Sequence, residues 1–367
     1  MIEYQNFINY FEQYPPLIII IWIGIAVFVL IILILIISIK LLRNHLRKKE
    51  NIIKEYEKEY ESNLIAYLYS GNEEEDISPE QRSIITQLKY CASDKFKRKV
   101  IVSVLLKLKS EISGEMDDSI QKLYFEADLL KYALDKLKSK RWYIIAYGIR
   151  ELTLFNVKEV HDEVIKKLHH PKRIVQKEVQ LYLVNLFHFK GLDFLNDLKT
   201  PLSEWDQIQL LEELQKFENQ EIPDITPWLR SENESVVFFA LKLAKIYNQF
   251  GVKNALIDLL SHKSKEVRIR LISVLSHLQV LESKEVLKNN FNEYSQDEQV
   301  AFFEMLENIF ESNDESFLLE HSHHNNFEIK YSILKILKIL NFDELRILRL
   351  ASGDSEYAKI VKFVENN

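Results

Sequence analysis

An uncharged apolar run, Leu17–Ile39, limits what the N-terminal part of this chain can become. As a helix rising 1.5 Å per residue it would be about 35 Å long, and the hydrocarbon core of a bilayer is about 30 Å thick. A helix in the core of a soluble protein normally keeps a polar face, and this run has none. Aromatic residues near its start fit the belt at a membrane surface; they are Tyr10, Phe11, Tyr14 and Trp22. We therefore predict a transmembrane helix at 17–39.

A cleaved signal peptide and a buried helix of a soluble protein are the two alternatives. A signal peptide needs a basic start, an apolar stretch of about 7–15 residues and a small-residue cleavage site. Residues 1–16 contain no Lys or Arg, and the run is longer than that stretch. Basic residues come directly after the run, at Lys40, Arg43, Arg47, Lys48 and Lys49. The positive-inside rule then predicts an uncleaved anchor with a short tail at 1–16 outside and residues 40–367 in the cytoplasm.

Residues 40–76 are expected to form a charged helical stalk that ends in an acidic turn, Gly71–Asp76. Apolar residues recur there at three-, four- or seven-residue spacing, which predicts an amphipathic helix continuing the membrane helix. They are Leu42, Leu46, Ile53, Tyr56, Tyr60, Leu64 and Tyr67. The stripe either packs on the following domain or forms a short coiled coil that would give a homodimer. The basic residues at 40–49 are expected to lie among anionic headgroups.

A helix start is predicted at Ser78-Pro79-Glu80-Gln81. Ser78 would be the N-cap, Pro79 the first helical residue and Gln81 the return arm of a capping box. The folded cytoplasmic domain is therefore expected to begin near residue 77. Its first part, 77–140, reads as irregular helices that cap the first regular repeat. The candidate helices are Ile84–Cys91, Lys99–Ile112, Ser119–Glu126 and Leu129–Leu137.

Composition favours an all-α protein. The 367 residues include only seven Gly and seven Pro, which argues against β-sandwiches, barrels and nucleotide-binding α/β domains. The single cysteine, Cys91, excludes an intramolecular disulfide and is expected as a small buried apolar side chain. The net charge of −7 argues against a nucleic-acid footprint along the whole chain.

The C-terminal half repeats with a period of about 31 residues, which lies in the range typical of solenoids. Blocks begin at 141, 172, 203, 234, 265 and 296, and a truncated seventh covers 327–354. Three columns carry the period: Val179, Leu210, Leu241, Ile272, Phe303 and Leu334; Leu198, Leu229, Leu260 and Phe291; Ile174, Trp205, Val236, Val267 and Ile329, broken by Glu298. Each block reads as two helices; in the fifth, Val267 to Leu278 is the first and Leu281–Asn289 the second. Such hairpins bury their apolar faces by stacking, so we predict an α-solenoid of about seven repeats at 141–354.

The segment KEVRIRLISVLSHLQVLESKEVLKNNF (265–291) resembles the HEAT-like repeat, with Val267-Arg268 opening its first helix. Residues 94–154 are similar to bacterial membrane-anchored HEAT-repeat proteins, and the resemblance covers 94–354. It implies a solenoid whose concave face, lined by second helices, holds another protein. Three features depart from the pattern: Asp206-Gln207, the prolines Pro223 and Pro227, and Glu298 in a core column.

Few residues suggest chemistry. His321, His323 and His324 could bind Zn or Ni, and the alternative is an exposed turn that is rich in His, as at His169-His170. Nucleotide-binding, zinc-protease and nucleophile-elbow motifs are missing from the sequence. We therefore predict no catalytic residue, no enzymatic activity and no cofactor.

Charge is segregated along the chain: residues 296–326 contain eight acidic residues and no Lys or Arg. This either leaves a solvated face or steers a partner. The candidate partner-binding residues are Lys138, Lys140, Arg141, Lys172, Arg173, Lys263, Arg268, Arg270, Glu304, Glu307 and Glu311. Exposed aromatic residues would strengthen such a surface; Trp142, Trp205 and Trp228 are candidates, although Trp205 lies in a predicted core column.

The sequence thus predicts a single-pass protein of the bacterial inner membrane, with a cytoplasmic solenoid and a C-terminal tail at 355–367. We expect a non-catalytic scaffold for protein partners, for instance an integral-membrane enzyme or transporter, and no nucleic acid. A HEAT-like lyase acting on a chromophore or other ligand, and a nucleic-acid-binding solenoid, are the alternatives.

Overall fold

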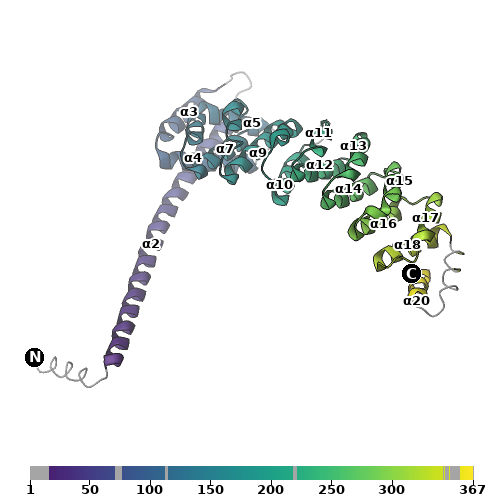
Figure 1. The fold of residues 1–367 in the computed structure, drawn as a ribbon. Coiled ribbons are helices and arrows are strands. Elements are labelled where there is room, and N and C mark those ends of the chain that lie inside the picture. Colours follow the sequence, from purple (N-terminus) through teal and green to yellow (C-terminus); the bar gives the residue numbers. More distant parts are fainter. Residues whose placement is uncertain are drawn as a thin grey trace, which may run out of the picture. The chain divides into compact units, whose positions relative to one another are not determined.

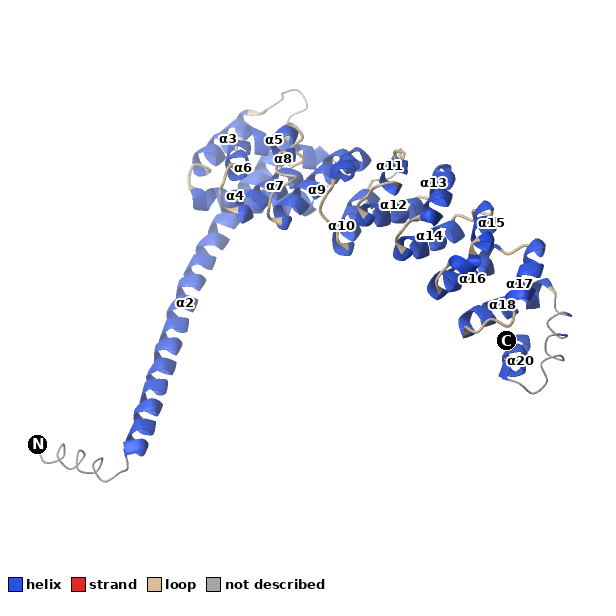
Figure 2. Ribbon diagram, viewed as in Figure 1, coloured by secondary structure: helices blue, strands red, loops and turns tan. Residues whose placement is uncertain are grey.

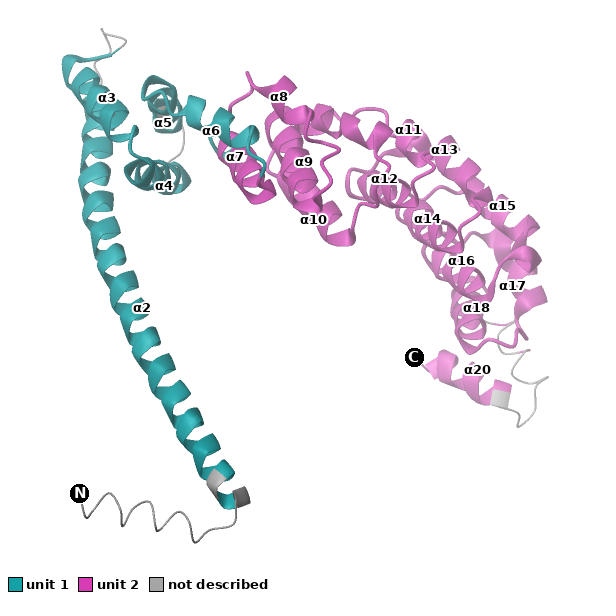
Figure 3. Cartoon of the chain, turned by 60° about the vertical axis from the view of Figure 1, so that its left-hand side comes forward, with its two compact units in different colours: residues 1–140, 154–156 teal, residues 141–153, 157–367 magenta. Residues whose placement is uncertain are grey.

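The computed structural model describes residues 16–70, 77–111, 115–217, 221–341, 343, 347 and 356–366. These residues form helices joined by short turns, with no strand among them (Figure 2), which confirms the predicted all-α class. They fall into two compact units (Figure 3): residues 1–140 with 154–156, and residues 141–153 with 157–367. Most of the predicted tail at 1–16, the acidic turn at 71–76 and most of 342–355 lie outside the described residues.

Helix α2 (Pro16–Tyr69) runs without interruption through the apolar run and the stalk (Figure 1). Within the described part of the chain it is the one helix long and apolar enough to cross a membrane. Its large apolar side chains between Ile20 and Ile39 expose 46–69% of their surface, so the protein itself does not cover them. A surface this apolar is stable only against another apolar medium, such as lipid.

Unit 1 is built on the C-terminal part of α2, which packs against α3, α4 and α5. The stalk stripe is buried there at Tyr60, Leu64 and Tyr67, whereas Leu42 and Leu46 are 58% and 55% exposed. Packing of the stripe on the following domain is therefore confirmed for its C-terminal part. The bounds are α3 (Pro79–Cys91), α4 (Lys95–Glu111), α5 (Glu115–Glu126) and α6 (Leu130–Leu137).

The predicted capping box at the start of α3 is confirmed. The N–H of Gln81 donates to Ser78 Oγ at 3.2 Å, and the N–H of Ser78 donates to Gln81 Oε1 at 3.0 Å. Gln81 Nε2 also donates to the carbonyl of Tyr67 at 3.0 Å. One glutamine thus starts α3 and holds it against the end of α2.

Unit 2 alternates longer and shorter helices. After α7 (Trp142–Leu154), the longer helices are α9 (Arg173–Phe187), α10 (Glu204–Gln215), α12 (Glu234–Ile246), α14 (Lys265–His277), α16 (Gln296–Ile309) and α18 (Phe327–Leu340). The shorter ones are α8 (His161–Ile165), α11 (Thr226–Leu229), α13 (Lys253–Asp258), α15 (Glu282–Asn289) and α17 (Glu315–His321). Helix α9 packs on α10, and α12, α14, α16 and α18 pack on one another in succession. In Figure 3 the longer helices lie on the inner side of the curve of unit 2, so the expectation that second helices line this side is wrong.

Two of the three predicted columns are buried throughout. The members of the first expose at most 2% of their surface: Val179, Leu210, Leu241, Ile272, Phe303 and Leu334. The members of the second expose at most 7%: Leu198, Leu229, Leu260 and Phe291. The two helices predicted in the fifth block are also present, as α14 and α15.

The third column is wrong at its first two positions. Ile174 and Trp205 are 51% and 62% exposed, while the next residues, Val175 and Asp206, are 0% and 9% exposed. The positions of the N-caps explain the shift. Asn233, the N-cap of α12, comes one residue earlier than the period predicts from Ser203, the N-cap of α10. A helix takes its register from its N-cap, so the shortened spacing displaces the buried face by one position.

The segment assigned to a C-terminal tail contains helix α20 (Glu356–Asn366), which packs on α18. Val361 and Val364 are buried with Leu334 of α18, and Lys338 Nζ donates to the carbonyl of Val364 at 3.0 Å. Helix α20 therefore covers apolar surface of α18, the last of the longer helices.

Candidate functional site

A mixed apolar and charged surface joins helices α10, α12 and α14. Arg270 of α14 donates through Nη2 to Glu204 Oε1 of α10 at 2.9 Å. The same guanidinium lies 4.4 Å from the ring centroid of Phe238 on α12, within cation–π distance. Trp205 and Ile208 of α10 are 62% and 41% exposed. We call this the Trp205 surface; it comprises Glu204, Trp205, Ile208, Phe238, Lys242 and Arg270.

Of the charged groups on this surface, Lys242 is half-buried, whereas Glu204 and Arg270 are exposed. Burial lowers the pKa of Lys242, Glu204 opposes that shift, and the like charge of Arg270 reinforces it. The hydrogen bond and charge of Arg270 lower the pKa of Glu204. Lys242 thus interacts with both members of the Arg270–Glu204 ion pair, and such a fixed arrangement of charges suits a partner's polar groups.

The three tryptophans considered as interface residues differ in their surroundings. Trp205 is exposed instead of packing in the core. Trp228 is only 3% exposed and donates from Nε1 to Asn196 Oδ1 at 2.9 Å, so it belongs to the core. Trp142 at the start of α7 is 38% exposed. Of the three, Trp205 is the most exposed, and the residue before it, Glu204, pairs with Arg270 of another helix.

Most of the segregated charges pair within unit 2. Acidic residues of 296–326 bind basic residues of the segments before and after them, so the local imbalance is compensated in space. The pairs are Lys265–Asp297, Arg268–Glu298, Lys284–Glu311, Lys284–Asp314, Lys288–Asp314 and Lys335–Glu307. The partners in each pair lie close to one sequence period apart. These ion pairs bridge successive helical hairpins.

The candidate partner-binding residues therefore divide into two sets. Engaged within the chain are Arg173 with Asp206, Arg268 with Glu298, Arg270 with Glu204, Glu307 with Lys335, Glu311 with Lys284, Lys138 with Asp135 and Arg141 with Tyr143. Exposed on the surface are Lys140, Lys172, Lys263 and Glu304. Lys138 and Lys140 belong to unit 1, and the others belong to unit 2. Of all these residues, only Arg270 lies on the Trp205 surface.

Asp314 and Glu298 have the most deeply buried carboxylates among the described residues. Asp314 is 0% and Glu298 is 1% exposed. Burial raises the pKa of Asp314, but hydrogen bonds from Lys288, the N–H of Glu311 and Lys284 outweigh it and hold that pKa below its usual range. The buried carboxylates are thus stabilised as anions by their partners, which is a structural role.

The three histidines predicted as candidate metal ligands have separate partners. His321 Nδ1 lies 2.9 Å from the carbonyl oxygen of Phe317, and the ring of His323 stacks on that of Tyr357 of α20 with the ring centroids 4.5 Å apart. His324 accepts a backbone N–H two residues later. Among the described residues, no group of three His, Cys, Asp or Glu is placed to hold a metal ion.

The histidines before three longer helices share one turn. In each, Nδ1 accepts the N–H of residue i+2, and a residue buried to 0% exposure lies at i+5. The bonds are Lys172 to His170, Ser264 to His262 and Asn326 to His324, at 3.0, 3.1 and 3.1 Å; the buried residues are Val175, Val267 and Ile329. The spacing of His and a β-branched residue five positions later was a signal in the sequence that would have placed Val175, and not Ile174, in the third column.

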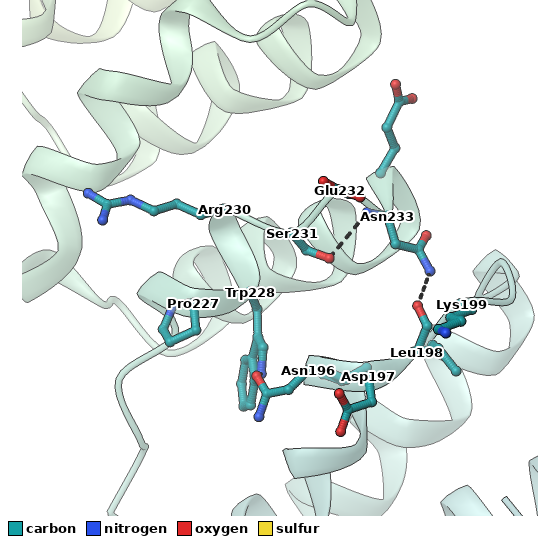
Figure 4. A pocket seen from close by; sticks show the side chains of 12 residues that line it. Asn196, Asp197, Leu198, Lys199, Pro227, Trp228, Arg230, Ser231, Glu232 and Asn233 are labelled. Atoms are coloured by element: carbon teal, nitrogen blue, oxygen red, sulfur yellow. Dashed lines mark hydrogen bonds between the residues drawn. The ribbon is translucent and has the colours of Figure 1, made fainter.

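A groove of about 940 Å³ lies between the end of the 3₁₀ helix η1 (His188–Asp197) and α11 (Figure 4). Asn233 Nδ2 donates to the carbonyl of Leu198 at 2.8 Å across it. A second groove, of about 500 Å³, is lined by Ile257 and Leu260, which lie two periods after Leu195 and Leu198. A groove that recurs with the period follows from the way hairpins pack, and we assign no chemistry to it.

Cys91 lies at the end of α3 and is half-buried, whereas the sequence predicted a buried side chain.

No protein-family model matches the chain, and no curated protein matches its sequence.

Proposed function

We propose that this protein is a membrane-anchored scaffold: a HEAT-like α-solenoid, held at the cytoplasmic face of a bacterial inner membrane by α2, that binds a protein partner without catalysis. The two buried columns and the alternation of long and short helices support the solenoid. The exposed apolar part of α2 and the basic residues after Ile39 support the anchor and its orientation.

The observation that carries the binding role is the exposure of Trp205. A tryptophan that is 62% exposed, with Ile208 beside it and the Arg270–Glu204 pair linking a neighbouring helix, combines the residue types that dominate interface energetics. Intramolecular ion pairs of Arg173 and Arg268 weaken the nucleic-acid alternative, because these guanidinium groups already have carboxylate partners.

Anchoring gives the scaffold its effect. A partner already in the membrane, such as an integral-membrane enzyme or transporter, meets the tethered surface at a raised effective concentration, so a modest affinity is sufficient.

Site-specific photo-crosslinking of the full chain in intact membranes tests this function. A photoreactive phenylalanine analogue at position 205 should trap one defined partner protein. The matched control is the same analogue at Leu281, an exposed apolar residue beside the shorter helix α15. Trp205→Ala should abolish co-purification of that partner while Leu281→Ala leaves it unchanged. Equal labelling from both positions, or unchanged co-purification with Trp205→Ala, would remove the assignment of this surface.

A further inference from the structure

The second residue of each longer helix of unit 2 changes character along the chain. In α7, α9 and α10 it is Tyr143, Ile174 and Trp205, which are 50%, 51% and 62% exposed. In the four longer helices that follow it is polar or acidic: Ser235, Glu266, Asp297 and Glu328. The first turn of a helix favours acidic side chains, because the N-terminal end of the helix dipole is positive. Exposed apolar residues at this position in three successive helices therefore indicate an interaction surface.

These three residues belong to one row. The short helices α8 and η1 return the chain after α7 and α9, so α7, α9 and α10 run in the same direction, side by side on the inner side of unit 2 (Figure 3). Tyr147 and Ile208, one turn further along α7 and α10, are 45% and 41% exposed and widen the row. We call these five residues the apolar row. It continues the Trp205 surface, which contains Trp205 and Ile208, towards α7.

The spacing of the row decides which kind of segment can follow it. Neighbouring helices lie about 10 Å apart, so the members of the row on successive helices are separated by about that distance. A partner helix rises about 1.5 Å per residue, so it covers this distance in about seven residues, or two turns, and presents the same face again. An extended strand covers it in about three residues, and its alternating side chains would turn the second contact away from the row. The spacing therefore fits a helix.

Charges beside the row favour an acidic helix. Arg173 and Arg270 are paired with Asp206 and Glu204. The other charged residues on this face of α7, α9, α10 and α12, or at its edge, are mostly basic: Arg141, Arg150, Lys172, Lys177 and Lys242 against Glu178 and Glu212. Arg141 lies at the edge of the row, where its Nη1 donates to the hydroxyl of Tyr143 at 3.1 Å. The excess of positive charge attracts Asp and Glu on the polar flank of a bound helix.

We propose that the protein partner contributes an acidic amphipathic helix of about 15 residues, which lies across α7, α9 and α10 with apolar residues at i, i+7 and i+14 on Tyr143, Ile174 and Trp205. This inference rests on the proposed function and specifies the segment that its binding surface receives. The row ends at α10, because the matching residues of α12 and α14 are Ser235 and Glu266, and this end sets the length of the bound helix.

Photo-crosslinking, with mass spectrometry of the crosslinked peptides, tests this geometry. The photoreactive phenylalanine analogue is placed at position 143, 174 or 205 of the full chain in intact membranes. The three positions should label one segment of one partner, at sites about seven residues apart and in the order of the three helices. The analogue at Glu266, the matching position of α14, is the control and should label that segment several-fold less. Sites about three residues apart, sites on separate segments or equal labelling from Glu266 would overturn the proposal.

The outcomes separate this inference from the proposed function. Labelling of a partner from position 205 alone would retain the scaffold and exclude a helix across α7 and α9. Failure to label any partner from position 205 would reject both.

Charge reversal tests the acidic character of the bound helix. Lys172→Glu should lower the amount of co-purified partner several-fold, whereas Lys263→Glu, at an exposed lysine before α14, should leave it unchanged. Ile174→Ala should cause a comparable loss by removing an apolar contact, and Glu266→Ala is its control. Since all four side chains belong to the surface, the thermal unfolding of the detergent-solubilised chain should stay the same. Unchanged co-purification with Lys172→Glu would show that the bound segment is not acidic.

Discussion

Arg268 Nε donates to Glu298 Oε1 at 2.6 Å, joining α14 to the start of α16. Glu298 also closes a capping box, accepting the N–H of Ser295 at 2.9 Å. The acidic residue that interrupts an apolar column is therefore both a helix cap and half of a buried ion pair. Asp206 repeats the arrangement with Ser203 and Arg173.

Glu298→Ala should destabilise unit 2 by about 3 kcal/mol, because it leaves the Arg268 guanidinium without its buried partner and α16 without its cap. Hydrogen exchange of α14 and α16 in the full chain measures the loss. The double variant Arg268→Met/Glu298→Leu should recover much of it, since an apolar pair of similar volume replaces a buried ion pair at little cost. If the double variant is no more stable than the single one, the ion pair is not the cause.

Gln279→Gly should stabilise unit 2 by about 1 kcal/mol, because Gln279 closes α14 in a left-handed conformation that costs L-residues about 1–2 kcal/mol and that Gly adopts freely. Its φ is 54°. Thermal unfolding followed by circular dichroism detects the gain. Asn248→Gly, at the matching position after α12 with a φ of 49°, should gain less, because Asn tolerates this region. A loss of stability in both would contradict the role of strain.

Acid should loosen the C-terminal end of unit 2. Burial, with the charges of His321 and Lys330, lowers the pKa of His324 below its ordinary value of about 6.5. The folded state therefore favours the neutral ring of His324. The folded state has its full stability above a pH of about 6.5, and it loses part of that stability as the pH falls from there through the lower folded-state pKa.

Protonation would also remove the acceptor that Nδ1 offers to Asn326. His324→Asn keeps a hydrogen-bond acceptor but cannot titrate. It should flatten the pH dependence of the amide protection factors in α18, which are exchange rates relative to the unfolded chain, between about pH 7.5 and about pH 5. His169→Asn, at an exposed position, serves as the control. An unchanged pH profile with His324→Asn would refute the assignment.

Helix α20 should protect α18. Val361→Asp places a charge at a position with 0% exposure against Leu334, so α20 should detach and α18 should exchange its amides faster. Lys362→Asp, the control, places the same carboxylate on the exposed side of α20. Equal exchange in the two variants would mean that α20 does not cover α18.

Local patterns predicted several elements correctly. The apolar run at 17–39, the capping box at Ser78 and Gln81 and the columns through Val179 and Leu198 each depend on residues close in sequence or on a constant step. Such signals survive into the structure because helix periodicity and capping are short-range effects.

The rest depended on contacts that no single segment contains. Trp205 has the same spacing as core residues, and the one-residue change in N-cap position turns it outward. The acidic run at 296–326 looked like a charged face, but its partners come from hairpins before and after it.

The sequence by itself determined the helical class, the apolar rod at 17–39 and most of the buried positions, because these follow from composition, from the turn of an α-helix and from the longer repeat of the C-terminal half. Tertiary structure decided which charges pair, which tryptophan faces solvent, how the imidazoles are used and where the stalk stripe is covered. Many of these outcomes depend on side chains about one repeat apart meeting in space, and a shift of register by a single position is enough to exchange an exposed side chain for a buried one.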